Sequence, residues 1–203
     1  MLTEVLTVDP RCPDPAVLAR AAALLRGGDL VAFPTETFYG LGAAALDAEA
    51  VRRVFAVKGR PESRPLLVLV DSVEMVERVA AAVPSAARGF MARHWPGALT
   101  LVLPAAANVP RELTAGTKTI GVRWSSHPIA TGLVTALGGP VTAPSANVSD
   151  GAPPTTADEV RAYFDGTIAL VLDGGPTAGG PPSTVLDVTV EPAHVLRAGA
   201  VAV

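Results

Sequence analysis

The chain has only one cysteine, Cys12, which excludes an internal disulfide and any metal site built from cysteines. Its three histidines, at positions 94, 127 and 194, are scattered without the spacing of metal ligands. It also has no apolar run near the roughly 18 residues that a membrane span needs, and acidic residues precede its first arginine, unlike a secretory signal. We therefore expect a protein of the cytoplasm, a reducing compartment, with no metal site of its own and no membrane contact.

The chain also lacks an excess of positive charge, because its formal net charge is −3. No global basic field is therefore expected to hold nucleic acid, although a local basic patch stays open. Aromatic residues are scarce at 4%, too few for a platform on which single-stranded bases stack. Lysine is scarce as well: Lys58 and Lys118 are the only two among 16 basic residues. In a chain that otherwise uses arginine, a lysine indicates a need for a compact point charge.

What the chain does have is an alternation of apolar, strand-like runs with segments of helical periodicity. No repeat, low-complexity tract or linker divides it, so we expect a single domain over residues 1–203. Strands follow strands near both ends, which favours some antiparallel pairs. The expected class is α/β: a twisted, open, mixed β-sheet with helices packed on it. The expected helices cover 15–26, 47–57, 72–82, 84–94, 129–137 and 157–164, and the expected strands cover 29–33, 66–70, 99–103, 119–124, 141–142, 168–172, 184–189 and 193–196.

Four polar stretches that contain glycine or proline lie at the ends of expected strands, where open α/β sheets place their ligands. The densest is Pro34–Gly42, in which Pro34 lacks a backbone donor and is expected to end the pairing of the first strand. In Ala143–Asn147, Ser145 and Asn147 lie two apart and face the same side of extended backbone, although a helix N-cap explains Asn147 almost as well. The remaining two stretches are the loops Lys58–Arg64 and Gly174–Thr184.

The loop that begins at Lys58 places Lys58, Arg60 and Arg64 within seven residues. Three cations on one loop suit a polyphosphate, with lysine as a point charge and arginine as a bidentate donor. The alternative is a solvated basic loop that Glu62 partly neutralises.

The standard nucleotide motifs are not met. Gly180 stands where the phosphate-binding loop requires a lysine, no GxGxxG opens the first strand-to-helix turn, and GxSxG is absent. The residues therefore predict a nucleotide-sized polar site without a standard nucleotide motif.

An ordered series of motifs, running from about residue 15 to the end of the chain, resembles the YrdC-like threonylcarbamoyl-AMP synthases. Each motif alone is modest, but their shared order makes the resemblance specific. The motifs are PTETFYGLG at 34–42, KGRP at 58–61, PL at 65–66, WPGALT at 95–100, GVR at 121–123, HP at 127–128, APSAN at 143–147, STV at 183–185 and LRAG at 196–199.

The resemblance implies the YrdC-like fold and a nucleotidyltransferase reaction. L-threonine, bicarbonate or CO2, and ATP give threonylcarbamoyl-AMP and pyrophosphate, usually with Mg²⁺. The product supplies the group placed on adenosine 37 of tRNAs that read codons beginning with A. The implied partners are these small molecules, the downstream tRNA-modifying threonylcarbamoyl transferase proteins, and tRNA itself in a weak contact. Because the chain ends soon after Gly199, it resembles the short, single-domain form.

The resemblance also assigns residues to the two larger ligands. The threonine site is expected to comprise Thr35, Leu67, Arg123, Ala143 and Ser183, with Arg123 on the carboxylate. The ATP site is expected to comprise Lys58, Arg60, Glu62, Thr119, Ser145, Asn147 and Arg197. A carbamate oxygen attacks the α-phosphorus in line, so positioning and neutralisation of the leaving pyrophosphate carry the step. We therefore expect no nucleophile, and we predict Lys58 and Arg60 as the catalytic charge pair.

Two positions depart from the family pattern, which often reads SANxSG followed by SPT. Here Asp150 follows Ser149, and Pro153 stands before Pro154. A serine hydroxyl that could contact ATP is therefore missing, and Asp150 adds a negative charge near the expected site, so nucleotide affinity or loop geometry is expected to differ from the family pattern.

Two other functions stay open. One is an enzyme of the same fold that makes a different carbamoyl-type adenylate, as the YrdC-like modules of hydrogenase-maturation carbamoyltransferases do. The other is a non-catalytic RNA-binding or ribosome-assembly factor that uses Lys58, Arg60 and Arg64. An enzyme requires these cations to line one cavity with Thr35 and Arg123, whereas an RNA binder spreads them over a convex face.

Overall fold

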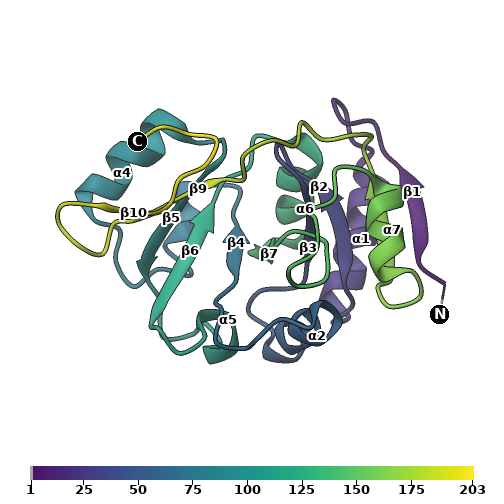
Figure 1. Ribbon diagram of the computed structural model, residues 1–203, viewed down its shortest axis with the longest axis horizontal. Helices are drawn as coiled ribbons and strands as arrows, with labels where there is room; N and C mark the ends of the chain where they lie inside the picture. Colours follow the sequence, from purple (N-terminus) through teal and green to yellow (C-terminus); the bar gives the residue numbers. More distant parts are fainter. Residues whose placement is uncertain (1) are drawn as a thin grey trace.

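The computed structural model describes residues 2–203, and within that range it forms two β-sheets flanked by helices (Figure 1). The helices are α1 (Pro15–Arg26), α2 (Ala48–Lys58), α3 (Val73–Val76), α4 (Ser85–His94), α5 (Arg111–Thr114), α6 (Pro128–Leu137) and α7 (Ala157–Phe164). The strands are β1 (Glu4–Thr7), β2 (Val31–Pro34), β3 (Tyr39–Gly42), β4 (Leu67–Leu69), β5 (Leu99–Pro104), β6 (Thr119–Arg123), β7 (Val141–Thr142), β8 (Leu170–Asp173), β9 (Thr184–Asp187) and β10 (His194–Arg197).

Both sheets are mixed, which confirms the expected α/β class with antiparallel pairs. The four-stranded sheet has the order β1-β8-β2-β3, with β2 and β3 antiparallel and the other neighbours parallel. The six-stranded sheet has the order β10-β9-β5-β6-β4-β7, in which parallel and antiparallel pairs alternate. Isolated bridges from Gly40 to Ser145 and from Ala44 to Val141 join the β3 side of one sheet to the β7 side of the other.

Local sequence explains where the main helices begin and end. The Asp14 side chain accepts a hydrogen bond from Ala16 N and caps α1, and Asp47 caps α2 in the same manner. Gly59 follows α2 with φ of 57°, the left-handed conformation that favours glycine at a helix end. These ends place Lys58 and Arg60 on either side of the helix terminus, next to the cavity described below.

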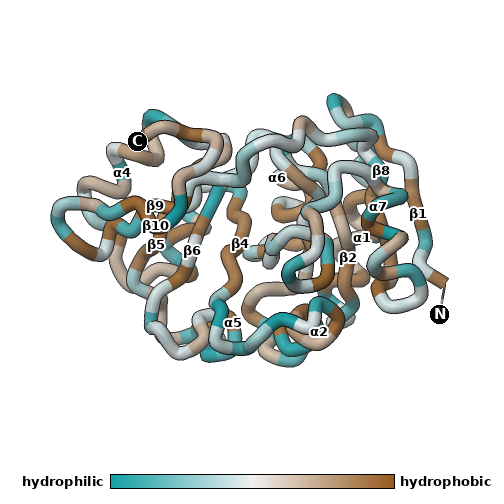
Figure 2. Tube along the Cα trace, in the orientation of Figure 1, coloured by the Kyte–Doolittle hydropathy of each residue, from teal (hydrophilic) through white to brown (hydrophobic). Residues whose placement is uncertain are grey.

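The hydrophobic core runs continuously through both sheets and the helices that cover them. All four residues of β2 are buried, and α1 and α6 supply buried Leu25, Leu133 and Val134. In Figure 1, β4 lies between the two groups of strands, and Figure 2 shows it as hydrophobic along its length. Burial of these side chains is the main stabilising contribution to the fold. No helix within residues 2–203 is both long and apolar enough to cross a membrane.

The structure differs from the sequence expectation at Pro34–Gly42, where Pro34 was expected to end the pairing of the first strand. Pro34 does not end the pairing, because it lies opposite Tyr39 in an antiparallel hairpin of β2 and β3. Glycine is a weak strand former, but a Cβ at Gly42 would lie 2.8 Å from the Phe33 ring, so the absence of a side chain allows the close packing.

The expected helix over 72–82 is also wrong in its length. Only Val73–Val76 is helical, and the chain then turns until Ala80 forms an antiparallel bridge with Ala105. Strand β1 and helix α5 were not expected. Glu4–Thr7 is short and partly polar, and Arg111–Thr114 is a single turn, so neither carries a clear periodicity.

Candidate active site

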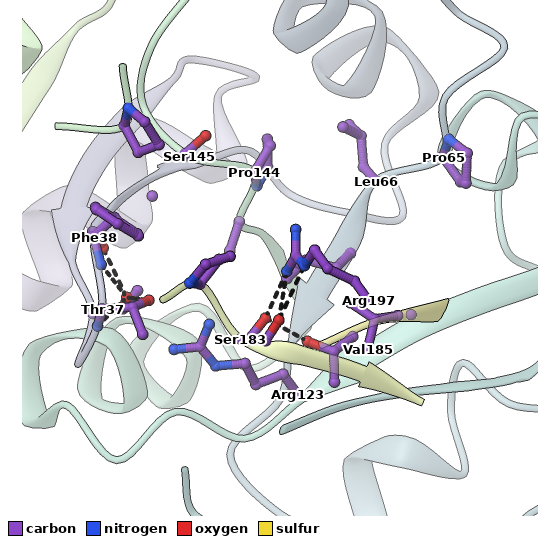
Figure 3. Close-up of a pocket in the computed structure, with 18 of the residues that line it drawn as sticks. Thr37, Phe38, Pro65, Leu66, Arg123, Pro144, Ser145, Ser183, Val185 and Arg197 are labelled. Atoms are coloured by element: carbon purple, nitrogen blue, oxygen red, sulfur yellow. Dashed lines mark hydrogen bonds between the residues drawn. The ribbon is translucent and has the colours of Figure 1, made fainter. Parts of the chain in front are cut away.

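A cavity of about 530 Å³ opens where the two sheets meet (Figure 3). Its walls come from the β2–β3 turn, from β4 and β6, from the segment after β7, and from β9 and β10 with the residues before β9. Three arginines and several hydroxyl groups face an otherwise apolar lining. Of the residues expected from the sequence, nine line this cavity: Thr35, Arg60, Leu67, Thr119, Arg123, Ala143, Ser145, Ser183 and Arg197.

Arg123, at the end of β6, is almost fully buried, with 5% of its side chain exposed. Its Nη2 lies 2.7 Å from Oε2 of Glu36, which follows β2 in the β2–β3 turn. Within the part of the chain that the structure describes, Nε and Nη2 of Arg123 and Oε1 of Glu36 make no hydrogen bond. Buried guanidinium donors at a cavity wall are the groups that a ligand carboxylate satisfies.

Glu36 is held in its charged form. Burial alone would raise the pKa of its carboxyl, but the Arg123 charge and the Ser125 hydroxyl outweigh burial and lower the pKa below its usual value. The Ser125 hydroxyl donates to Glu36 Oε2, and Ser125 Oγ also accepts from His127 N at 3.2 Å. Ser125 therefore fixes the carboxylate to the start of α6.

The β2–β3 turn is ordered by the buried hydroxyl of Thr35. It donates to the carbonyl oxygen of Phe38 at 2.7 Å and accepts from the backbone N–H groups of Thr37 and Phe38 at 3.2 and 3.3 Å. A side chain that satisfies its own turn in this way makes the local backbone rigid. The turn thus presents Thr35, Thr37 and Phe38 to the cavity in a fixed arrangement.

Ser183, just before β9, lies at the centre of a second hydrogen-bonded group. Its Oγ is 3.0 Å from the hydroxyl oxygen of buried Thr100, and Arg197 Nη2 donates to it at 3.1 Å. Figure 3 shows the guanidinium groups of Arg123 and Arg197 on either side of Ser183. Burial and the Arg123 charge lower the pKa of Arg197.

Arg60 lines the cavity near the end of α2. Its Nε donates to the carbonyl oxygen of Arg64 at 3.1 Å, and its Nη2 donates to that of Pro65 at 3.0 Å. Burial and the Arg64 charge lower the pKa of Arg60. Arg60 and Arg197 have no acidic partner among residues 2–203, so their positive charge is available to an anion.

Lys58 and Asn147, expected to bind ATP, lie behind the cavity wall. The Lys58 Nζ donates to the carbonyl oxygens of Ser145 and Asn147, both at 2.5 Å, and the Lys58 residue is only 3% exposed. Asn147 Nδ2 donates to the carbonyl oxygens of Val148 and Gly151 at 2.6 and 2.8 Å. Both side chains shape the loop that carries Ser145.

Glu62 does not join the other expected residues. It lines a separate, shallow hollow with Arg111, Glu112 and Ala115. The departures at positions 150 and 153 lie in different places. Asp150 is exposed and lies 3.5 Å from Arg64 Nη1, so it neutralises an exposed cation, whereas Pro153 lines the cavity.

Sequence reasoning did not assign Glu36 or Thr100. Both stand inside the quoted motifs, but nothing in the sequence shows that Glu36 meets Arg123 or that Thr100 meets Ser183. Glu36 and Arg123 belong to different sheets, and Ser183 meets Thr100 because β9 pairs with β5, so only the tertiary fold brings these partners together.

The lining of the cavity offers hydroxyl and guanidinium groups and no carboxylate. Within residues 2–203, no three His, Cys, Asp or Glu side chains gather to hold a metal ion. Magnesium prefers oxygen ligands and is commonly held by phosphate oxygens and water. The lining residues therefore supply no carboxylate ligand for a metal ion.

The chain resembles proteins of known name over most of its length. Residues 23–199 match the Sua5–YciO–YrdC domain family, described as "Telomere recombination". A threonylcarbamoyl-AMP synthase of Pyrococcus abyssi is 48% identical over 88% of this chain and 53% of its own length. One of Bacillus subtilis is 44% identical over 98% of this chain and 56% of its own.

Among solved structures, P. abyssi Sua5 complexed with L-threonine superimposes with a TM-score of 0.94 and 45% identity. The match covers 97% of this chain and 58% of that chain. The chain thus spans a little more than half the length of these relatives.

Proposed function

The chain belongs to the Sua5–YciO–YrdC family, and we propose that it makes threonylcarbamoyl-AMP from L-threonine, bicarbonate or CO2, and ATP. The membership confirms the resemblance drawn from the motifs. One observation carries the proposal: Arg123, whose Nε makes no hydrogen bond and whose Nη2 lies beside Glu36, shares a cavity with Arg60 and Arg197, which have no acidic partner among residues 2–203. The reaction is that of a nucleotidyltransferase, and we propose that its product passes to the tRNA-modifying proteins that act on adenosine 37.

The threonine end of the cavity is proposed to lie between Arg123 and the β2–β3 turn. The Arg123 N–H groups that make no hydrogen bond among residues 2–203 suit a carboxylate, and the lining hydroxyl of Ser183 suits the hydroxyl of threonine. Thr35 is proposed to act here by holding the β2–β3 turn that forms the wall. Leu67 and Ala143 supply apolar wall next to them. The structure of P. abyssi Sua5 with L-threonine supports this assignment by likeness.

The ATP end is proposed to lie between Arg60 and Arg197, with Thr119 and Ser145 as uncharged donors. A triphosphate carries several negative charges, and two cations that have no acidic partner within residues 2–203 favour its binding. Mg²⁺ is proposed to arrive bound to the phosphates, where it supplies further charge neutralisation. Glu62 lines the separate hollow and not this end of the cavity, so the structure does not support its expected contact with ATP.

The reaction needs positioning more than acid–base chemistry. The threonine amine forms a bond to the carbon of CO2 and releases its proton to solvent, which gives a carbamate. A carbamate oxygen then forms a bond to the α-phosphorus, the bond from that phosphorus to the β-bridging oxygen breaks, and pyrophosphate leaves. Arg60 is proposed to neutralise charge on the leaving group, while Arg123 holds the other end of the substrate in line.

Lys58 is proposed to neutralise phosphate charge together with Arg60, and it also has a structural role. Its ammonium holds the backbone of the loop that carries Ser145 with two of its three N–H donors, and the third donor is proposed to reach a phosphate oxygen. Burial and the Arg60 charge lower the pKa of Lys58 to about 8. A phosphate anion nearby would favour its charged form.

The placement of the cations argues against the RNA-binding alternative. Arg60 lines the cavity together with Thr35 and Arg123, whereas Lys58 is buried and exposed Arg64 is paired with Asp150. These three cations therefore do not form one convex basic face.

The proposal is tested by incubating the chain with ATP, L-threonine and labelled bicarbonate, with each substrate omitted in turn. Label in an acid-labile adenylate that contains threonine, with release of pyrophosphate, is the expected result. An arm with carbamoyl phosphate in place of threonine and bicarbonate examines the related carbamoyl-adenylate reaction. Pyrophosphate release in that arm, and none with threonine, would overturn the proposal.

A further inference from the structure

The three arginines of the cavity differ in their charge balance. Arg123 has a carboxylate partner, Glu36, at 2.7 Å. Arg60 and Arg197 donate to backbone carbonyls, Arg197 also to a hydroxyl, and neither has an acidic partner among residues 2–203. The Arg123–Glu36 pair is therefore close to neutral by itself, and the net positive charge of the cavity comes from Arg60 and Arg197.

The Glu36–Arg123 pair is well placed to act on a ligand. Its side chains are 19% and 5% exposed, so water screens it weakly. The Ser125 hydroxyl and the rigid hydrogen bonds of Thr35, the residue before Glu36, hold the carboxylate in place. Glu36 itself does not line the cavity, so it acts on the ligand through Arg123.

The charge balance at Arg123 determines which ligands bind favourably. A lone buried Arg123 would attract any carboxylate, because an unpaired charge of low exposure is strongly stabilised by an anion. With Glu36 beside it, the net charge is near zero, and a ligand with net negative charge meets repulsion from Glu36 as well as attraction from Arg123. A zwitterion carries no net charge and keeps its hydrogen bonds to the guanidinium.

We propose that Glu36 is a specificity-determining residue, which neutralises Arg123 so that the site selects zwitterionic amino acids over other carboxylates. The inference rests on the proposed function, because it deepens the assignment of the threonine end. The positive charges of Arg60 and Arg197, which have no acidic partner among residues 2–203, remain available to bind the triphosphate. Glu36 is a positioning residue in this account, since it touches Arg123 and not the ligand.

The test compares the binding of L-threonine with that of the analogue in which a hydroxyl replaces the ammonium group, 2,3-dihydroxybutanoate of matching stereochemistry. Dissociation constants are measured calorimetrically for the unaltered chain and for Glu36→Gln. The unaltered chain should prefer threonine, and Glu36→Gln should reduce that preference about tenfold, mainly by binding the hydroxy acid more tightly. A ratio that stays within about twofold of the unaltered chain would overturn the inference.

Two further variants separate charge from structure. Glu36→Asp keeps the negative charge and should retain the preference for threonine; loss of the preference in this variant would contradict a charge effect. Glu77→Gln breaks a surface pair with Arg88, whose atoms lie 3.1 Å apart, and should leave both dissociation constants unchanged.

A measurement on the unaltered chain covers the case in which Glu36→Gln does not fold. A roughly hundredfold excess of acetate over threonine should displace little threonine, because a neutral site does not attract a simple anion. Efficient displacement would overturn the inference. If the unaltered chain binds no threonine at all, the proposed function is wrong and this inference is wrong with it.

Discussion

The guanidinium of Arg197 donates to the carbonyl oxygen of Ser183 from Nε at 3.1 Å and from Nη2 at 2.8 Å, and Nη2 also donates to the Ser183 hydroxyl at 3.1 Å. The two residues belong to different proposed sites, because Arg197 is assigned to ATP and Ser183 to threonine. One side chain therefore connects both ends of the cavity. A substitution of Arg197 is therefore expected to weaken the binding of both ATP and threonine.

The first prediction follows from that connection. Arg197→Ala should raise the KM for ATP and the KM for threonine, each by about tenfold, because it removes a cation and also releases Ser183. Initial rates of pyrophosphate release at varied concentrations of each substrate measure the effect. Arg88→Ala, which removes a surface arginine paired with Glu77, is the matched control and should change neither KM. An effect confined to ATP would contradict the connection.

The second prediction concerns Gly199, which packs directly on the backbone that carries Ser183. A Cβ at Gly199 would lie 2.1 Å from the carbonyl oxygen of Pro182, so the segment after β10 must move away in Gly199→Ala. The free energy of unfolding should fall by about 2 kcal/mol or more, and threonine binding should weaken. Urea unfolding and calorimetry measure the two effects.

Gly89→Ala is the control for this substitution. Gly89 lies in α4, and its Cβ would meet only the end of the Arg93 side chain, at 3.6 Å. Alanine is the better helix former, so this variant should be as stable as the unaltered chain or more stable by up to about 1 kcal/mol. An equal fall in the free energy of unfolding of Gly199→Ala and Gly89→Ala would contradict a specific packing role for Gly199.

Much of the fold could be predicted because its buried strands are short apolar runs between glycines and prolines. Leu99–Pro104 and Leu170–Asp173 are examples, and both were expected to within two residues. The division of the strands into two sheets could not be predicted. Glu4, near the start of the chain, pairs with Leu170 far along the sequence, and no local pattern encodes a partner so distant.

The candidate site shows the same limit. The residue types were readable from the sequence, since Arg60, Arg123 and Arg197 all stand in the motifs and all line the cavity. Their environments were not readable. Lys58 and Arg60 are two residues apart, yet the turn at Gly59 leaves one buried behind the wall and the other in the cavity.

The third prediction uses the pKa of Lys58, which burial and the Arg60 charge lower to about 8 from a usual value of 10.5. Between these two values the unfolded chain holds the proton that the folded chain has lost. The free energy of unfolding should therefore rise with pH from about 8 to about 10.5, relative to a variant without this group. Urea unfolding of the unaltered chain and of Lys58→Met across that range measures the difference. A difference that is independent of pH would show that the pKa of Lys58 is not lowered.

The fourth prediction isolates the hydroxyl that supports Ser183. Thr100 is 1% exposed, and its Oγ1 lies 3.0 Å from Ser183 Oγ. Thr100→Val keeps the shape but removes the hydrogen bond, so Ser183 should lose its fixed orientation and the KM for threonine should rise about fivefold. The KM for ATP should stay within about twofold, because the variant leaves Arg197 in place. Steady-state rates with each substrate varied in turn measure both values.

The matched control for Thr100→Val is Thr135→Val in α6, where the hydroxyl donates to Asp71 at 2.7 Å on an exposed part of the chain. It removes the same hydroxyl from a threonine that does not line the cavity, and neither KM should change. An equal rise in both KM values for Thr100→Val would indicate a general loss of packing in the cavity wall. A selective rise for threonine places Thr100 in the support of Ser183, and so assigns this part of the wall to the amino acid and not to the nucleotide.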